Sequence, residues 1–238
     1  MNNNSKLPII PLFFPWKDSN GKILNLFQLY SSRFFTINFL IIIWTFWFLF
    51  GDMSTIYCIT PNEKIGCSAA IWHKNWNSPA KYFISFFTAP FFYNSEQHIR
   101  FTTISFLIFV QSFEAKVGSL NTIKLFFITN ISISILGGIT SNFGSILFPE
   151  LEIFSYMLER NWMGASGAFM GIIGAMSHLC RFRLLFPIAV LFFESWNFFI
   201  NGISLSISIT HVIGCVFGYC FWKAKINRNN FGLLSKTN

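Results

Sequence analysis

The chain has 238 residues, of which 53% are hydrophobic and only 11% are charged. Soluble domains carry about 25% charged residues, so this composition excludes a water-facing globular surface and indicates an integral membrane protein. In such a chain the net charge of +8 reflects topology rather than nucleic-acid binding. We therefore expect the lipid bilayer as a partner and no nucleic acid.

The chain begins with a polar stretch, residues 1–33, that contains three prolines and four basic residues. No short apolar stretch with a small-residue cleavage site precedes the first long apolar run, so we expect no removable signal peptide. Residues 34–50 form that run and predict the first membrane span. The loop 51–97 follows. Its aromatic part, 82–93, is too short to span and is expected to lie at the interface or to re-enter partway.

Five further apolar runs predict five more spans, at about 99–115, 120–140, 164–180, 184–201 and 205–222. The fold class is therefore all-α, a polytopic bundle of six transmembrane helices over 34–222. Residues 1–33 are expected to be a cytosolic N-terminal segment and residues 223–238 a basic cytosolic tail. The sequence contains no tandem repeat.

The distribution of basic residues supports an even number of spans. Six spans put both termini, the 2–3 link and the 4–5 link on one side of the membrane. That side then carries twelve of the 17 basic residues: Lys6, Lys17, Lys22, Arg33, Lys116, Lys124, Arg181, Arg183, Lys223, Lys225, Arg228 and Lys236. The positive-inside rule places both termini in the cytosol or its organellar equivalent.

The five cysteines show no zinc-type spacing with histidine, and we expect neither a metal nor another cofactor. Cys58 and Cys67 lie in the polar loop and could pair if the loop faces an oxidising compartment. The other three cysteines lie in apolar runs and are interpreted as packing residues. His73, in the same polar loop, is expected to be solvated.

The fourth predicted span begins with an unusual run of small residues, NWMGASGAFMGIIGAM, with Ser166 near its start. Gly167 and Gly171 have the spacing that lets membrane helices approach closely, and a serine there can simply bond its own helix or a neighbour. Packing alone is therefore one interpretation of Ser166.

The sixth predicted span favours a second interpretation, a nucleophile, because it contains His211 within an apolar run. Gly214 and Gly218 follow near the same helical face and would permit close contact with the fourth span. His211 lies about 9 Å from the outer end of its span, at a depth similar to that of Ser166. His178 is a poorer partner, since it lies about 18 Å along the same helix as Ser166.

These motifs resemble those of the rhomboid intramembrane serine proteases. The similarity includes Gly164-Ala165-Ser166-Gly167 and the His211-xx-Gly214-xxx-Gly218 pattern, and it covers about residues 82–222. The stretch 98–119 also resembles the family's second span, which starts with a histidine and ends in a Glu, basic, Gly, Ser pattern; the matching residues are His98, Glu114, Lys116, Gly118 and Ser119.

The resemblance implies a serine endopeptidase with a Ser166–His211 dyad and no acidic member. The oxyanion would be held by the backbone N–H of Ser166 and by His98, with Thr102 nearby. The glycines Gly164, Gly167, Gly171, Gly214 and Gly218 would pack at the site. Substrates would be single-pass transmembrane proteins that reach the site laterally, past the fifth span. The loop 51–97 would be the family's membrane-embedded first loop.

The sequence departs from the family pattern at three places. Thr102 replaces an asparagine, Met170 replaces a tyrosine that stacks on the histidine, and Lys81-Tyr82 stands where a Trp-Arg pair is usual. An inactive rhomboid-like protein that binds membrane clients is therefore the alternative. A small transporter or channel is a third class, which the absence of repeats disfavours.

Two other acidic residues have structural or unassigned interpretations. Glu114 is expected to cap a helix or to pair with a basic residue. Glu194 lies inside the fifth predicted span, where a carboxylate is costly without a partner, and the sequence names none. For localisation, the secretory pathway or plasma membrane is favoured, with an organelle inner membrane as the alternative.

Overall fold

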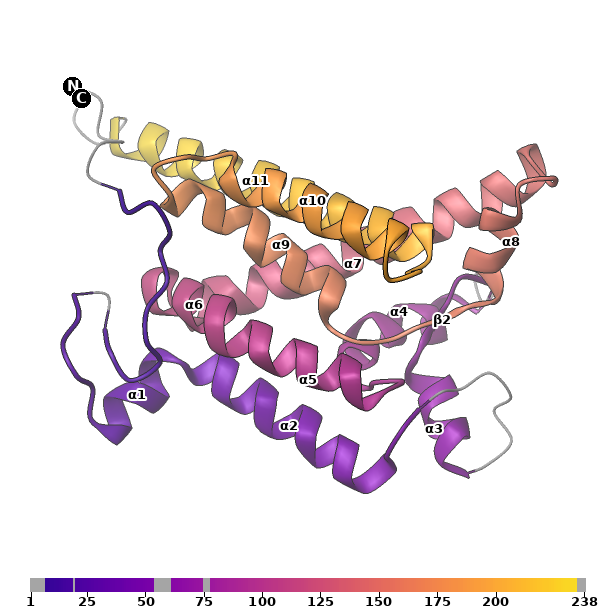
Figure 1. Ribbon diagram of the computed structural model, residues 1–238, viewed down its shortest axis with the longest axis horizontal. Helices are drawn as coiled ribbons and strands as arrows, with labels where there is room; N and C mark the ends of the chain where they lie inside the picture. The colour runs from indigo at the N-terminus through magenta and orange to yellow at the C-terminus, as the bar shows by residue number, and fades with distance from the viewer. Residues whose placement is uncertain (1–6, 19, 54–60, 75–77, 235–238) are drawn as a thin grey trace.

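The computed structural model describes residues 7–18, 20–53, 61–74 and 78–234 as an all-helical bundle with one two-stranded ribbon (Figure 1). Lys6, Cys58 and Lys236, which the predictions above use, lie outside these residues. Cys67 is disulfide-bonded, and Cys180, Cys215 and Cys220 are free.

The N-terminal half contains helices on both sides of the ribbon's first strand along the chain. The elements are α1 (Leu26–Ser32), α2 (Phe34–Phe50), α3 (Pro61–Ala69), β1 (Ile71–Trp72), α4 (Pro79–Thr88) with a 3₁₀ turn (Ala89–Phe91), and α5 (Glu96–Ser105). Helix α5 continues through a π-helical turn (Phe106–Val110) into α6 (Gln111–Val117).

The C-terminal half contains the longest helices. It comprises α7 (Ser119–Leu147), α8 (Glu152–Glu159), β2 (Asn161–Trp162), α9 (Ser166–Met176) with a 3₁₀ turn (Ser177–Leu179), α10 (Leu185–Phe199) and α11 (Leu205–Leu234). Helix α9 packs most extensively on α11, and also on α7.

Two described helices are long and apolar enough to cross a membrane, Ser119–Leu147 and Leu205–Asn227. Helices α1 and α2 together would be a third, although they are bent by 86° at their junction. Ser166–Leu179 and Leu185–Phe199 are apolar but shorter. The helical, apolar bundle is confirmed, and the number of six spans stays a prediction.

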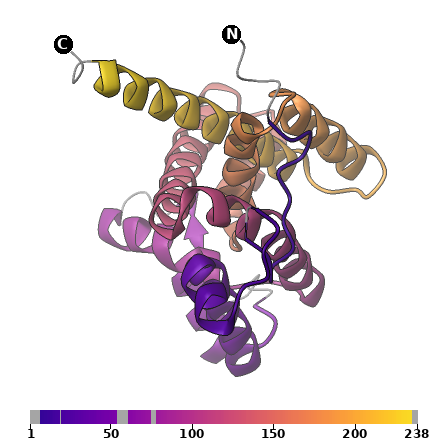
Figure 2. The same ribbon diagram turned by 90° about the vertical axis from the view of Figure 1, so that its left-hand side faces the viewer.

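The links between the helices gather at two ends of the bundle. At the left of Figure 1 lie the N-terminal segment, the α6–α7 link, the α9–α10 link and the end of α11; at the right lie α3, α8 and the α10–α11 link. Figure 2 shows the N-terminal segment crossing the left-hand end. It is fastened there, since Arg181 N–H donates to Pro8 O at 2.8 Å and Phe13 N–H to Ser112 Oγ at 3.0 Å.

Glu114 caps helix α2 from outside that helix. Its carboxylate, 1% exposed, accepts the backbone N–H groups of Phe35 at 2.6 Å and Thr36 at 2.9 Å. It also accepts the hydroxyls of Thr36 and Ser119. The two backbone donors belong to the first turn of α2, whose N–H groups lack intrahelical partners and favour a negative charge. The expected capping role is confirmed, and it ties α2 to α6.

His73 is buried, so the expectation that it is solvated was wrong. The side chain is 3% exposed and its Nδ1 lies 2.9 Å from the Tyr82 hydroxyl, which donates to Ser134 O. Burial lowers the pKa of His73 to about 4. The neutral ring therefore donates from Nδ1 to Tyr82, and this chain of hydrogen bonds holds the first loop against α7.

The π-helical turn divides the run 96–117 into two parts with different neighbours. Before the turn, His98 and Thr102 lie near the segment that leads into α9. After it, Gln111 hydrogen-bonds Arg33 and Phe13 O, and Glu114 caps α2. A π turn accommodates one extra residue within a helix and often occurs at functional sites.

Candidate active site

Ser166 is the first residue of α9 and is reached through a constrained stretch of chain. Strand β2 pairs antiparallel with β1, with Trp162 opposite Ile71. Two residues later, Gly164 N–H donates to Ala89 O at 2.9 Å and Gly164 has φ +91°. This left-handed conformation favours glycine. The turn ends the extended segment and directs the chain into α9 at Ser166.

His98 lies directly against this turn. A Cβ added to Gly164 would lie 2.4 Å from His98 Cε1 and 2.7 Å from Nε2. Glycine is therefore required at 164 by space as well as by backbone conformation. The other ring nitrogen, Nδ1, is 3.2 Å from Asn94 Oδ1, and Tyr93 packs edge-on against the ring. Two side chains thus orient the imidazole beside the residues that precede Ser166.

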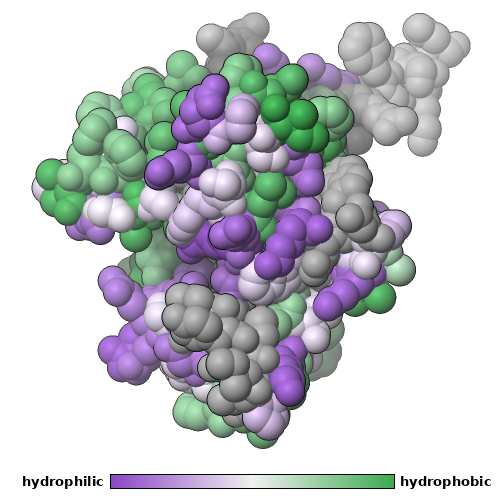
Figure 3. Space-filling model, turned by 90° about the vertical axis from the view of Figure 1, so that its right-hand side faces the viewer, coloured by the Kyte–Doolittle hydropathy of each residue, from purple (hydrophilic) through white to green (hydrophobic). Residues whose placement is uncertain are grey.

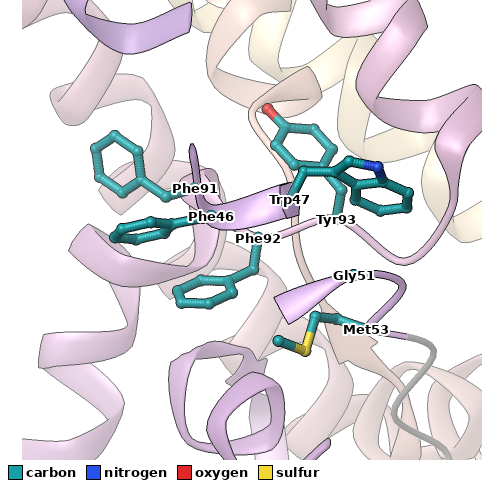
Figure 4. A pocket seen from close by; sticks show the side chains of 7 residues that line it. All are labelled: Phe46, Trp47, Gly51, Met53, Phe91, Phe92 and Tyr93. Atoms are coloured by element: carbon teal, nitrogen blue, oxygen red, sulfur yellow. The ribbon is translucent and has the colours of Figure 1, made fainter. Parts of the chain in front are cut away.

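Tyr93 and Thr102 extend the same cluster. The buried Tyr93 hydroxyl faces the Thr102 hydroxyl and the Ala165 backbone, but among the described residues neither hydroxyl has a hydrogen-bond partner of regular geometry. Thr102 is 2% exposed. Figure 4 shows Tyr93 lining a small pocket with aromatic residues of α2 and of the turn after α4. Met53 N–H, which donates to Tyr93 O at 3.1 Å, fixes the backbone there.

Helices α9 and α11 meet through a glycine seam, which we define as Gly167, Gly171 and Gly174 of α9 with Gly214 and Gly218 of α11. A Cβ on Gly214 would lie 2.6 Å from Gly167 O, and one on Gly218 only 1.9 Å from Gly171 O. A Cβ on Gly174 would lie 1.9 Å from Cys215 O. The two backbones are thus in direct contact, as close packing of small residues allows.

Met170 lies one turn after Ser166 and borders this seam. It is 3% exposed, and its Cβ would be 3.5 Å from a Cβ on Gly214. If α9 and α11 lay further apart, a gap would open beside Met170. Met170 therefore fills the space beside the turn of α11 that carries His211.

His211 is held by a carboxylate of the neighbouring helix α10. Its Nδ1 lies 2.8 Å from Glu194 Oε1, and the two side chains are 12% and 3% exposed. His211 also lies near enough to act electrostatically on His98. His178 is engaged elsewhere, with its Nε2 2.9 Å from Tyr219 O.

Ser166 and His211 stand on facing helices on either side of the seam, but they are not hydrogen-bonded to each other in the part of the chain that the structure describes. The neighbours of both residues are in contact: Gly167, next to Ser166, meets the turn of α11 at Thr210 and Gly214. The Ser166 N–H and the two that follow it belong to the first turn of α9, where N–H groups lack intrahelical partners. The cluster therefore combines a serine, two histidines and free backbone donors.

Sequence reasoning did not single out Tyr93, Asn94 or the partner of Glu194. Asn94 lies four residues before His98 but outside α5, whose N-cap is Ser95, so the spacing gives no helical signal for the contact. The signal for Glu194 was stronger: Glu194 and His211 lie at similar distances from the short α10–α11 link, and both are ionisable groups in apolar helices. Two such groups at one depth on consecutive helices are natural partners.

The bundle thus defines a helical membrane-type protein with a serine and histidines gathered where α5, α9 and α11 meet. The family model for the Rhomboid domain matches residues 80–227, which is more than half of the chain. The chain therefore belongs to the rhomboid family, and the expected resemblance is confirmed. Comparisons with curated proteins and with solved structures find no match.

Proposed function

We propose that this rhomboid family member is an intramembrane serine endopeptidase that cleaves single-pass membrane proteins within or near their transmembrane helix. The observation that carries the proposal is the glycine seam. It holds the start of α9 against the turn of α11 that contains His211, so the serine and a basic side chain stand on closely packed, facing helices. A serine needs such a base to act as a nucleophile.

In the proposed reaction Ser166 Oγ attacks the scissile carbonyl carbon while its proton passes to Nε2 of His211. The C–N bond then breaks, and the same proton goes to the leaving amine. Water hydrolyses the acyl-enzyme in a second round, with His211 accepting the water's proton and returning one to Ser166. No metal or other cofactor takes part in these steps.

The negative charge that develops on the carbonyl oxygen needs hydrogen-bond donors. We assign this role to the backbone N–H of Ser166 and to His98, whose ring lies against Gly164. Thr102, with its unpartnered buried hydroxyl, is assigned a secondary role, in place of the family's asparagine. One such donor lowers the barrier by about 3 kcal/mol.

Substrate chemistry follows from the surroundings of the site. A transmembrane helix must unwind before its carbonyl can be attacked, because its backbone groups are satisfied internally. We therefore expect substrates with small or helix-breaking residues near the cut, reaching the site past α10.

Figure 3 shows hydrophilic side chains over the middle of the end formed by α3 and α8, and we assign this end to the non-cytosolic side, from which water reaches Ser166. Both termini are then cytosolic, and the secretory or plasma membrane remains our preferred location.

The test is cleavage of a single-pass reporter by purified protein in liposomes, together with labelling by a fluorophosphonate, which reacts with activated serines. We expect Ser166→Ala to abolish both. Ser177→Ala is the matched control, since Ser177 is a buried serine of the same helical run with an unpartnered hydroxyl, and it should retain both. Absence of labelling and cleavage in the wild type would instead favour the client-binding alternative.

A further inference from the structure

The carboxylate of Glu194 is the feature of the molecule that the proposed dyad leaves unused. It lies within the apolar helix α10 and is 2% exposed. Ionisable side chains in such helices are costly unless they have a partner and are functional candidates by default. Its described partner is His211, through Oε1 at 2.8 Å, while Oε2 has none. The contact therefore involves the one residue that the proposed function takes as its base.

The hydrogen bond selects which nitrogen of His211 is basic. A neutral imidazole has one N–H donor and one bare nitrogen acceptor. A carboxylate accepts only, so Nδ1 carries the proton and donates it to Glu194. Nε2 is then the bare nitrogen, and it is the nitrogen available to the serine. The carboxylate also stabilises the imidazolium that forms when Nε2 takes a proton.

We propose that Glu194 is a positioning residue for His211, so that this chain works with a Ser166–His211–Glu194 triad. The inference rests on the proposed function. During attack the proton of Ser166 Oγ moves to Nε2, while the Nδ1 proton stays on the imidazole and keeps its hydrogen bond to Glu194. The leaving amine then takes the proton from Nε2.

A purely mechanical role for Glu194 makes a different prediction. The same bond fastens α10 to α11, and α10 is the helix past which substrates are proposed to pass. A fastening role alone would change how a helical substrate enters, whereas a small fluorophosphonate would still react at the wild-type rate. The labelling rate of Ser166 therefore separates positioning of the base from control of access.

The decisive variant is Glu194→Gln, which keeps the shape but replaces the acceptor by an amide that can donate to Nδ1 and favour the wrong tautomer. We expect the second-order rate of fluorophosphonate labelling to fall by about 100-fold or more, as loss of an effective general base does. The kcat for the reporter should fall similarly, with KM unchanged. Glu194→Asp keeps the charge and should recover part of the loss.

Thermal unfolding of each variant shows whether it is folded. Should Glu194→Gln not fold, Glu194→Met, which removes the buried charge and the hydrogen bond together, carries the same expectation. A folded variant of either kind that labels at the wild-type rate overturns the proposal, including the case in which only KM for the reporter changes. A wild-type protein that neither labels nor cleaves overturns the proposed function itself, and the triad with it.

Discussion

Two regions of the bundle hold their helices together by opposite means. In the glycine seam, backbone touches backbone and no side chain separates α9 from α11. Between α2, the π-helical turn and α7, the contact consists of phenylalanine rings, with Phe39 stacked on Phe106 at 4.5 Å and edge-on to Phe126 at 5.2 Å. A backbone has no rotamers with which to adjust, whereas rings can shift and repack. The proposed reacting groups therefore lie on the region with the least freedom.

The largest effect is expected where the seam is broken. In Gly218→Ala the new methyl group would lie 1.9 Å from Gly171 O, so the helices must move apart. We expect a loss of about 3 kcal/mol in the free energy of unfolding, as for overpacking elsewhere, and loss of reporter cleavage because His211 moves with α11. Thermal unfolding and the cleavage assay measure the two effects.

The control for this variant is Gly202→Ala in the α10–α11 link. Gly202 has φ +66° and open space around its Cα, so alanine there adds backbone strain of about 1 kcal/mol without a clash. Cleavage by the folded protein should survive. If Gly202→Ala lost as much stability and cleavage as Gly218→Ala, close backbone contact in the glycine seam would not be the cause of the losses.

A smaller effect is expected from breaking the polar contact between Glu114 and the first turn of α2, on the side of the molecule where phenylalanine rings pack. Glu114→Gln removes a charged acceptor of two backbone N–H groups of α2. Hydrogen bonds to charged groups contribute about 2 kcal/mol, and we expect a loss of that size in denaturant or thermal unfolding. Each folded molecule should still cleave, because the contact is at the other end of α5–α6. Glu150→Gln, an exposed carboxylate, is the matched control and should be neutral.

The smallest effect is expected from a substitution among the packed phenylalanine rings. Phe126 is fully buried, yet Phe126→Leu leaves a hydrophobic side chain that neighbouring rings can close upon. We expect a cost of about 1 kcal/mol and unchanged kcat. Phe143→Leu, at an exposed position of α7, measures the effect of the same substitution outside the core. If Phe126→Leu lowered the free energy of unfolding more than Gly218→Ala does, the phenylalanine contact would be the less adaptable of the two regions, and the comparison would be wrong.

The bounds of a helix could be predicted from the sequence where the apolar run and the helix end at the same residues. The first apolar run, 34–50, coincides with α2, and the fifth nearly coincides with α10. Helix α7 continues past the predicted end because Ser141 and Asn142, although polar, bond back to Gly137 O and Gly138 O and leave the helix intact. Helix α11 likewise continues into the basic tail. A hydropathy pattern detects the edge of the apolar run and not the end of the hydrogen-bonded helix.

Contacts between distant residues were predictable only where small residues signalled them. The spacing of Gly167, Gly171, Gly214 and Gly218 pointed to the partners that the structure brings together. The bond between His211 and Glu194 was signalled only by the similar depth of the two groups, which does not fix a contact, since the sequence holds the position of each residue along its helix but not the rotation of one helix against another. The burial of His73 was missed for a related reason: a polar loop can fold back onto a helix and lose its water.

The π-helical turn Phe106–Val110 has a consequence for how the two ends of one helical run are aligned. An α-helix advances about 100° per residue, so one accommodated residue rotates everything before it relative to everything after it by that angle. The part before the turn can therefore be oriented by the surroundings of Ser166, while the part after the turn is oriented by α2. Removing a single residue from this turn would leave both ends helical and yet point one of them in the wrong direction.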